Sequence, residues 1–351
     1  MLNMDILILS IFAIVVVLSF IEDYIPAWQK IIILITIGIA LVCISVFKPM
    51  STADANNYET YFYLYDDTIV EMSVEPSYRY LSRFYLSFGF GITAIFLTYA
   101  LIAIPLKLAL LWKLTPFVFT SMIVYVGIYY PLHDVVQIRC GAATAFLLLA
   151  MVPLEKRQYF KALALMIVAA LFHYSSLAFL PIFLLGNIKV GKYWKWVLAA
   201  AIPICLLLYL AGFSAFSFIP SSMTEGKLDI YKDMSDLGLW GKNYVPYKNI
   251  IFVAEFTLLY LFIYFYDTIK EHCIYAPILI KVLALEMGYF IMFAEVEVLG
   301  NRLHELFGMF NVLAYTQCLY IIKPRYIVRI GLAVFSLIYY LIQMYNEVYF
   351  H

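Results

Sequence analysis

The chain has 351 residues, of which 65% are hydrophobic and 13% are charged. Because soluble domains carry about 45–50% apolar and about 25% charged residues, this composition excludes an ordinary soluble protein. The 23 basic and 23 acidic residues give a net charge of zero, which argues against nucleic acid as a partner.

Apolar runs follow one another along nearly the whole chain, separated by short polar gaps. A helix needs about 20 apolar residues to cross the hydrocarbon core of a bilayer. The runs are approximately 4–21, 31–47, 89–106, 116–130, 138–154, 162–188, 196–213, 250–266, 275–293, 304–322 and 327–346. They predict an all-α polytopic membrane protein that forms a single transmembrane bundle over residues 1–351.

The run 162–188 differs from the others because basic clusters flank it on both sides. Lysine and arginine are enriched in cytoplasmic loops, so both flanks are expected in the cytoplasm. A segment that begins and ends on one side must turn back, and the expected turn is His173-Tyr174-Ser175-Ser176. This turn gives a short re-entrant-like helix pair. With the run 162–188 counted as two segments, the chain is expected to have about 12 transmembrane segments.

Two long loops, 48–88 and 214–249, fall on the opposite side of the membrane in this topology, and both are rich in acidic residues. Short basic loops inside and long acidic loops outside are the asymmetry expected of a membrane protein. Both loops and both termini are therefore predicted to be extracytoplasmic.

The first long loop is expected to contain an amphipathic helix that begins at Pro76, since proline suits the first helical turn. Arg79 and Arg83 lie four residues apart on one face, and Tyr78 falls on another. Such a helix suits the membrane–water interface. Its aromatic residues, with Tyr58 earlier in the loop, either stack on the sugar rings of a substrate or form an ordinary aromatic belt.

Arg139 opens an apolar helix and is followed by small residues, which let helices approach closely. A charge at such a position costs free energy unless it is paired or faces water. Because the guanidinium fork suits phosphate, Arg139 is expected to clamp a lipid diphosphate. The alternative is an ion pair with Asp134 or with a lipid headgroup.

His173 lies at the expected turn of the re-entrant pair. Irregular backbone at membrane depth survives only where protein or water covers it, which indicates a cavity beside this residue. A neutral histidine there is a candidate general base or a hydrogen-bonding group for sugar or phosphate. Alternatively, it satisfies backbone groups freed at the break.

Arg302 and His304 lie at an outer helix junction near the end of the chain. Arg302 either pairs with Glu305, three residues further on, or supplies a second cation for a diphosphate. His304 is counted with the candidate substrate-binding residues of this junction.

Several motifs are absent from the sequence. It contains no DxD, no Walker A lysine motif and no GxSxG elbow, and its five cysteines are scattered without a CxxC pair. The sequence therefore predicts no cofactor and no metal site, and it gives no sign of an ATP pump or a serine hydrolase.

Taken in order, these motifs resemble the EpsG-type branch of the Wzy polysaccharide polymerases. The resemblance rests on residues 54–58 and Glu75-Pro76-Ser77-Tyr78, on Arg139 before its small residues, on 172–176 and on 301–303. It covers most of the chain, from about residue 50 to residue 310.

The resemblance implies an enzyme of the bacterial inner membrane that acts at the outer leaflet. Such enzymes join oligosaccharide repeat units carried on undecaprenyl diphosphate, with the lipid diphosphate as leaving group and with no nucleotide sugar or metal. A chain-length regulator is a partner that the resemblance leaves open.

Carried onto this sequence, the resemblance implies that Arg139 and Arg302 hold the donor diphosphate. The base that takes the proton from the attacking hydroxyl stays open among His173, Asp54 and Glu75. The remaining candidate substrate-binding residues are Arg79, Arg83, Tyr58, Tyr78 and His304.

Other functions compete with a polymerase. A transporter such as a flippase for lipid-linked oligosaccharides fits twelve helices, but transporters often carry two related halves with matching broken helices, and one break is visible here. A membrane acyltransferase that modifies surface sugars would also use an intramembrane histidine, but its acyl donor should enter from the cytoplasm. The polar candidates here gather on the outer side. A non-catalytic assembly partner is a third alternative.

Overall fold

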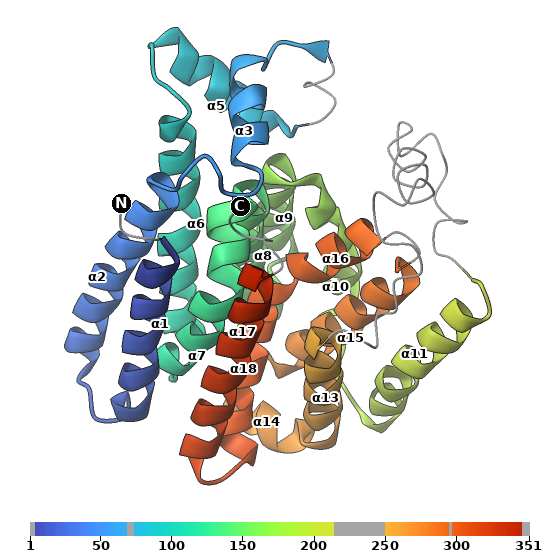
Figure 1. Ribbon diagram of the computed structural model, residues 1–351. Helices are drawn as coiled ribbons and strands as arrows, with labels where there is room; N and C mark the ends of the chain where they lie inside the picture. The colour runs from blue at the N-terminus through green and yellow to red at the C-terminus, as the bar shows by residue number, and fades with distance from the viewer. Residues whose placement is uncertain (1–3, 69–73, 214–249, 295–296, 346–351) are drawn as a thin grey trace. The chain divides into compact units, whose positions relative to one another are not determined.

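A computed structural model describes residues 4–68, 74–213, 250–294 and 297–345, and every regular element in these ranges is a helix (Figure 1). The chain divides into two compact units. Unit 1 is Met1–Phe179 with Val312–His351, and unit 2 is Leu180–Asn311. The prediction of one transmembrane bundle over the whole chain stays a prediction.

Unit 1 contains long apolar helices joined by short connections, and two shorter helices in the first long loop. Its elements are α1 (Met4–Ile21), α2 (Ala27–Val46), α3 (Ala55–Tyr63), α5 (Pro76–Ser87), α6 (Thr93–Leu114), α7 (Val118–Val124), the π-helix η1 (Tyr125–Val136), α8 (Ile138–Glu155), α9 (Tyr159–Phe172), the 3₁₀-helix η2 (Tyr174–Phe179), most of α17 (Gly308–Ile321) and α18 (Arg325–Tyr345).

Unit 2 is built from shorter helices. They are α10 (Leu180–Leu185), α11 (Lys192–Leu210), α13 (Ile250–Tyr264), α14 (Tyr266–His272), α15 (Ala276–Met292), α16 (Glu297–Leu306) and the first residues of α17. The second long loop expected from the sequence, 214–249, lies outside the described residues.

The chain is a multi-pass membrane protein. Six described helices are long and apolar enough to cross a bilayer: α1, α2, α6, α8, α11 and α18. The pair α13 and α14, bent by 84°, adds a seventh if it counts as one broken span. The total of about 12 segments, in which the run 162–188 counts as two, stays a prediction.

The break expected at His173 is present. Helix α9 ends at Phe172, His173 has an extended backbone with φ −157° and ψ 113°, and a 3₁₀-helix begins at Tyr174. A helix also begins at Pro76 as expected, and Arg83 lies on its exposed face while Tyr78 is buried. Figure 1 shows α5 beside α3, and α5 also packs against α6 and α9.

The small residues after Arg139 have the packing role that the sequence predicts. A Cβ atom on Gly141 would lie 2.2 Å from the carbonyl oxygen of His133, so only glycine fits between α8 and η1. The sequence predicted an ordinary span over 116–130, but the chain passes from α7 into a buried π-helix that contains Pro131. The π-helix directs Asp134 toward Lys107, whose Nζ lies 2.8 Å from Oδ1.

Candidate active site

Three predicted residues far apart in the sequence form one cluster in unit 1. Glu75 lies at the start of α5, Arg139 in the first turn of α8, and His173 directly after α9. Arg139 Nη1 lies 2.5 Å from Glu75 Oε2, and His173 Nδ1 lies 2.8 Å from Glu75 Oε1. We call these residues the Glu75–Arg139–His173 cluster.

The carboxylate of Glu75 is the centre of this cluster. Besides the two side-chain contacts, its Oε1 accepts a hydrogen bond from the backbone N–H of Tyr174 at 3.3 Å. Burial by itself would raise the pKa of Glu75, but Arg139 and the hydrogen bond from His173 outweigh burial and lower this pKa to about 2. Glu75 is therefore an anion at every physiological pH, and a poor proton acceptor.

The ionised carboxylate fixes the tautomer of His173. Because Glu75 Oε1 can only accept a hydrogen bond, Nδ1 carries the proton and Nε2 carries the lone pair. No described residue hydrogen-bonds Nε2, and 19% of the His173 side chain is exposed. This arrangement presents a basic nitrogen toward space outside the cluster.

Arg139 is held by the same carboxylate but is not enclosed by it. The guanidinium carbon lies 5.5 Å from the ring centroid of Tyr58, within the range of a cation–π contact. Among the described residues, Nε has no hydrogen-bond acceptor, and 18% of the side chain is exposed. The alternative pairing of Arg139 with Asp134 is not observed, because Asp134 binds Lys107 and accepts a hydrogen bond from Tyr125.

Buried aromatic rings pack next to Arg139 of the cluster. Tyr58 and Tyr78 have ring centroids 5.8 Å apart, and Tyr78 and Tyr99 have theirs 6.1 Å apart. The Tyr78 hydroxyl donates to the Tyr58 carbonyl oxygen at 2.6 Å. Both rings predicted to stack on sugars are thus inside the protein, where they support Arg139, and sugar stacking by Tyr58 and Tyr78 stays a prediction.

Lys48 is a residue of this region that sequence reasoning missed. Its Nζ donates to the carbonyl oxygen of Val135 at 2.5 Å and lies 4.1 Å from the ring centroid of Phe96 and 5.7 Å from that of Tyr58. Burial lowers the pKa of Lys48 to about 7, against a smaller opposing effect of Asp54. A lysine just after an apolar run is typical of a helix end at the membrane surface, so nothing in the sequence pattern assigns it to a site.

The other predicted residues of the first loop lie around the cluster. Asp54 precedes α3 with a left-handed φ of 63°, and its Oδ1 accepts a hydrogen bond from Asn57 at 3.3 Å. Arg79 is partly buried on α5 and Arg83 is exposed. Their predicted roles, base for Asp54 and headgroup ligands for the arginines, stay predictions.

Arg302 and His304 belong to unit 2, whereas Arg139 belongs to unit 1. Arg302 is exposed on α16, and the two-arginine clamp stays a prediction. His304 is buried and contacts Glu255 and Glu286, two residues that sequence reasoning missed. A signal was present, because each is an acidic residue inside an apolar run, and such residues are functional candidates by default.

The EpsG family model matches residues 30–351, which is most of the chain and includes the whole cluster. The chain belongs to the EpsG family. Members of this family are membrane proteins similar to Wzy-type polysaccharide polymerases, so membership agrees with the resemblance found in the sequence motifs. Searches among curated proteins and among solved structures gave no match.

Membership in the EpsG family supports a polymerase-like, glycosyltransferase-like role in polysaccharide biosynthesis. The same family match includes the cluster of an oriented imidazole, a carboxylate that orients it, and a guanidinium.

Proposed function

We propose that this EpsG family protein polymerises oligosaccharide repeat units carried on undecaprenyl diphosphate at the outer leaflet of the bacterial inner membrane. An acceptor hydroxyl attacks the anomeric carbon of the donor chain. The bond between that carbon and the diphosphate oxygen breaks, a glycosidic bond forms, and the lipid diphosphate leaves. The observation that carries the proposal is the Glu75–Arg139–His173 cluster inside the family match.

His173 is the base in this proposal. With Nδ1 held by Glu75, Nε2 accepts the proton of the attacking hydroxyl. The imidazolium that forms is stabilised by the Glu75 anion and by the carboxyl end of α9, which carries a partial negative charge. Glu75 acts through His173 and is a positioning residue, since a carboxyl group with a pKa of about 2 is a weak base.

Arg139 contacts the donor diphosphate in this proposal. Its Nη1 is used by Glu75 and its Nε is buried, so the exposed part of the guanidinium is the part proposed to contact phosphate oxygens. Negative charge grows on the leaving diphosphate as the glycosidic bond breaks, so a fixed cation stabilises the transition state more than the ground state. Arg302 remains a predicted second phosphate ligand.

An apolar groove of about 540 Å³ between α2 and α6 suits the lipid chain of the carrier. Its lining includes Ile35, Gly38 and Ala109 and extends along α6 from Leu101 to Trp112, roughly 16 Å at 1.5 Å per residue. The same two helices reach the cluster region: Lys48 follows α2, and Tyr99 of α6 contacts Tyr78. A prenyl chain in this groove would leave its diphosphate near the cluster.

The test is chain extension by the purified protein. Wild type is incubated with a matched undecaprenyl-diphosphate repeat unit, without nucleotide sugar, and the lipid-linked products are separated on a gel. We expect a ladder from wild type and from the control Arg157→Ala, which removes an exposed arginine, and none from Arg139→Ala. Absence of a ladder from folded wild type with a verified substrate would contradict the polymerase, and flipping of the same lipid in vesicles would then favour a transporter.

A further inference from the structure

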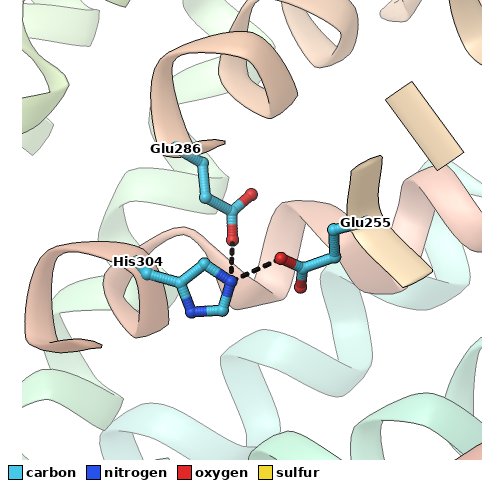
Figure 2. Close-up of side chains that lie close together, drawn as sticks. All are labelled: Glu255, Glu286 and His304. Atoms are coloured by element: carbon cyan, nitrogen blue, oxygen red, sulfur yellow. Dashed lines mark hydrogen bonds and ion pairs between the residues drawn. The ribbon is translucent and has the colours of Figure 1, made fainter. Parts of the chain in front are cut away.

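Unit 2 contains a second cluster of ionisable side chains in the apolar interior. Glu255 of α13, Glu286 of α15 and His304 of α16 converge, as Figure 2 shows. Glu255 and Glu286 are fully buried, and 4% of the His304 side chain is exposed. We call these residues the Glu255–Glu286–His304 cluster.

One ring nitrogen of His304 faces both carboxylates. Nε2 hydrogen-bonds Glu255 Oε2 and lies 3.5 Å from Glu286 Oε1. Each residue offers one ligand atom, and these three atoms lie within 4.8 Å of one another. In a tetrahedral zinc site with bonds of about 2.0–2.1 Å, neighbouring ligand atoms are roughly 3.3 Å apart. The cluster is therefore of the size that a small cation requires, after a small rotation of Glu255.

Further contacts hold the ligands in place. Asn311 Nδ2 donates to Glu255 Oε1 at 2.7 Å and to Glu286 Oε1 at 2.8 Å. The ring of His304 stacks on Phe290 with centroids 4.4 Å apart. Hydrogen bonds and packing that orient ligand side chains are typical of protein metal sites.

A separate observation also indicates a ligand. Glu286 Oε2 is buried and has no hydrogen-bond partner among the described residues. A buried carboxylate oxygen without a donor is costly in free energy, and two carboxylates placed together in an apolar interior repel each other. A divalent cation bound by both oxygens of Glu286 would give Oε2 a partner and neutralise both carboxylates.

We propose that Glu255, Glu286 and His304 bind a divalent transition-metal ion, with Zn²⁺ as the best fit. One imidazole nitrogen and two carboxylate oxygens form a mixed set suited to Zn²⁺, whereas Mg²⁺ and Ca²⁺ prefer oxygen ligands alone. The ion ties α13, α15 and α16 together. It stands apart from the polymerase proposal, because its test measures bound metal instead of activity.

The competing arrangement has no metal: one carboxyl group is protonated and an imidazolium pairs with the other. The variant Glu286→Gln separates the two, because glutamine resembles a protonated glutamate and removes a metal ligand. Glu271→Gln, an exposed acid of the same unit, is the matched control. His304→Gln and the exposed His272→Gln form a second matched pair.

The full-length protein is purified in detergent, stripped with a chelator and dialysed against Zn²⁺ or Mn²⁺, and bound metal is measured by mass spectrometry. We expect about one equivalent of Zn²⁺ in wild type and in both controls, and its loss in Glu286→Gln and His304→Gln, as three protein ligands define one site. No bound metal in wild type, or full retention by Glu286→Gln, would overturn the proposal.

A second measurement decides the case if the variants fail to fold. Zn²⁺ added to chelator-treated wild type should raise Tm, since an ion that binds only the folded state stabilises it. An unchanged Tm at saturating Zn²⁺ would overturn the proposal even without variant data.

Discussion

The two clusters use the same kinds of side chain in opposite ways. In unit 1, one carboxylate is shared by an arginine and a histidine, and both of these side chains are partly exposed. In unit 2, one histidine is shared by two carboxylates, and all three residues are buried. The first arrangement balances its own charge and leaves a basic nitrogen accessible, which suits proton transfer. The second places two carboxyl groups against one imidazole away from water, an arrangement that suits a bound cation.

The first cluster is therefore expected to affect catalysis, and the second is expected to affect metal binding and stability. Removing a member of the Glu75–Arg139–His173 cluster should reduce turnover more than stability, except where a buried charge loses its partner. Removing a member of the Glu255–Glu286–His304 cluster should first reduce metal content and thermal stability.

The largest expected effect is on turnover in the His173→Gln variant. Loss of a general base costs about 10²–10⁴-fold in rate. We expect kcat for chain extension to fall within this range, with the variant still folded and KM little changed. The matched control His272→Gln should keep wild-type kinetics, and a similar loss in both variants would remove the base assignment.

The next effect is the change of Tm on addition of Zn²⁺, which should depend on the cluster in unit 2 and not on the cluster in unit 1. After chelation, added Zn²⁺ should raise the Tm of wild type and of Glu75→Gln alike, because Glu75 is not part of the cluster in unit 2. Glu286→Gln should show no such rise. Saturation at 100 times Kd corresponds to about 2.7 kcal/mol of stabilisation, which is readily measured by thermal unfolding. A Zn²⁺ response that depends on Glu75 would place the ion elsewhere.

A smaller effect is expected from filling the groove of unit 1. Ala109→Trp places a large ring among the groove residues, and Val17→Trp on the exposed face of α1 is the control. We expect KM for the lipid-linked substrate to rise several-fold with kcat unchanged, as for loss of binding that is equal in ground state and transition state. Equal KM values for both tryptophan variants would exclude the groove as the lipid site.

The smallest effect concerns the pH dependence of stability through Lys48. Burial lowers the pKa of Lys48 to about 7 in the folded chain from its ordinary value of 10.5. Between these pH values the unfolded chain binds more protons, so stability rises with pH in this window. Below pH 7 the lysine is charged in both states. The rise in Tm from pH 7 to pH 9 should be smaller in Lys48→Met than in wild type, and an identical rise would contradict the assignment.

The sequence predicted the members of the first cluster because each interrupts a pattern. Glu75 precedes the proline that begins a helix, Arg139 opens an apolar helix, and His173 breaks one. Their pairing was not predictable, since Asp134 is nearer to Arg139 along the chain. The π-helix turns Asp134 toward Lys107, and that irregular element has no periodic signature in the sequence.

The second cluster was predicted only through His304. Glu255 and Glu286 are isolated acids in separate apolar runs, and a single residue gives no periodicity from which to infer its neighbours. Their convergence depends on how α13, α15 and α16 pack. Packing of short helices is decided by many small contacts, which no local pattern in the sequence encodes.

The central claim is that Glu75 acts by orienting His173. Its most direct test is a double-mutant cycle on the rate of chain extension, with all variants purified in the same way. Rates are measured for wild type, Glu75→Gln, His173→Gln and the double variant, all reconstituted in the same lipid. If Glu75 acts by orienting His173, the double variant is no slower than His173→Gln alone, because residues that act as a unit are strongly non-additive. Losses that multiply in the double variant would show that the two residues act independently and would contradict the account.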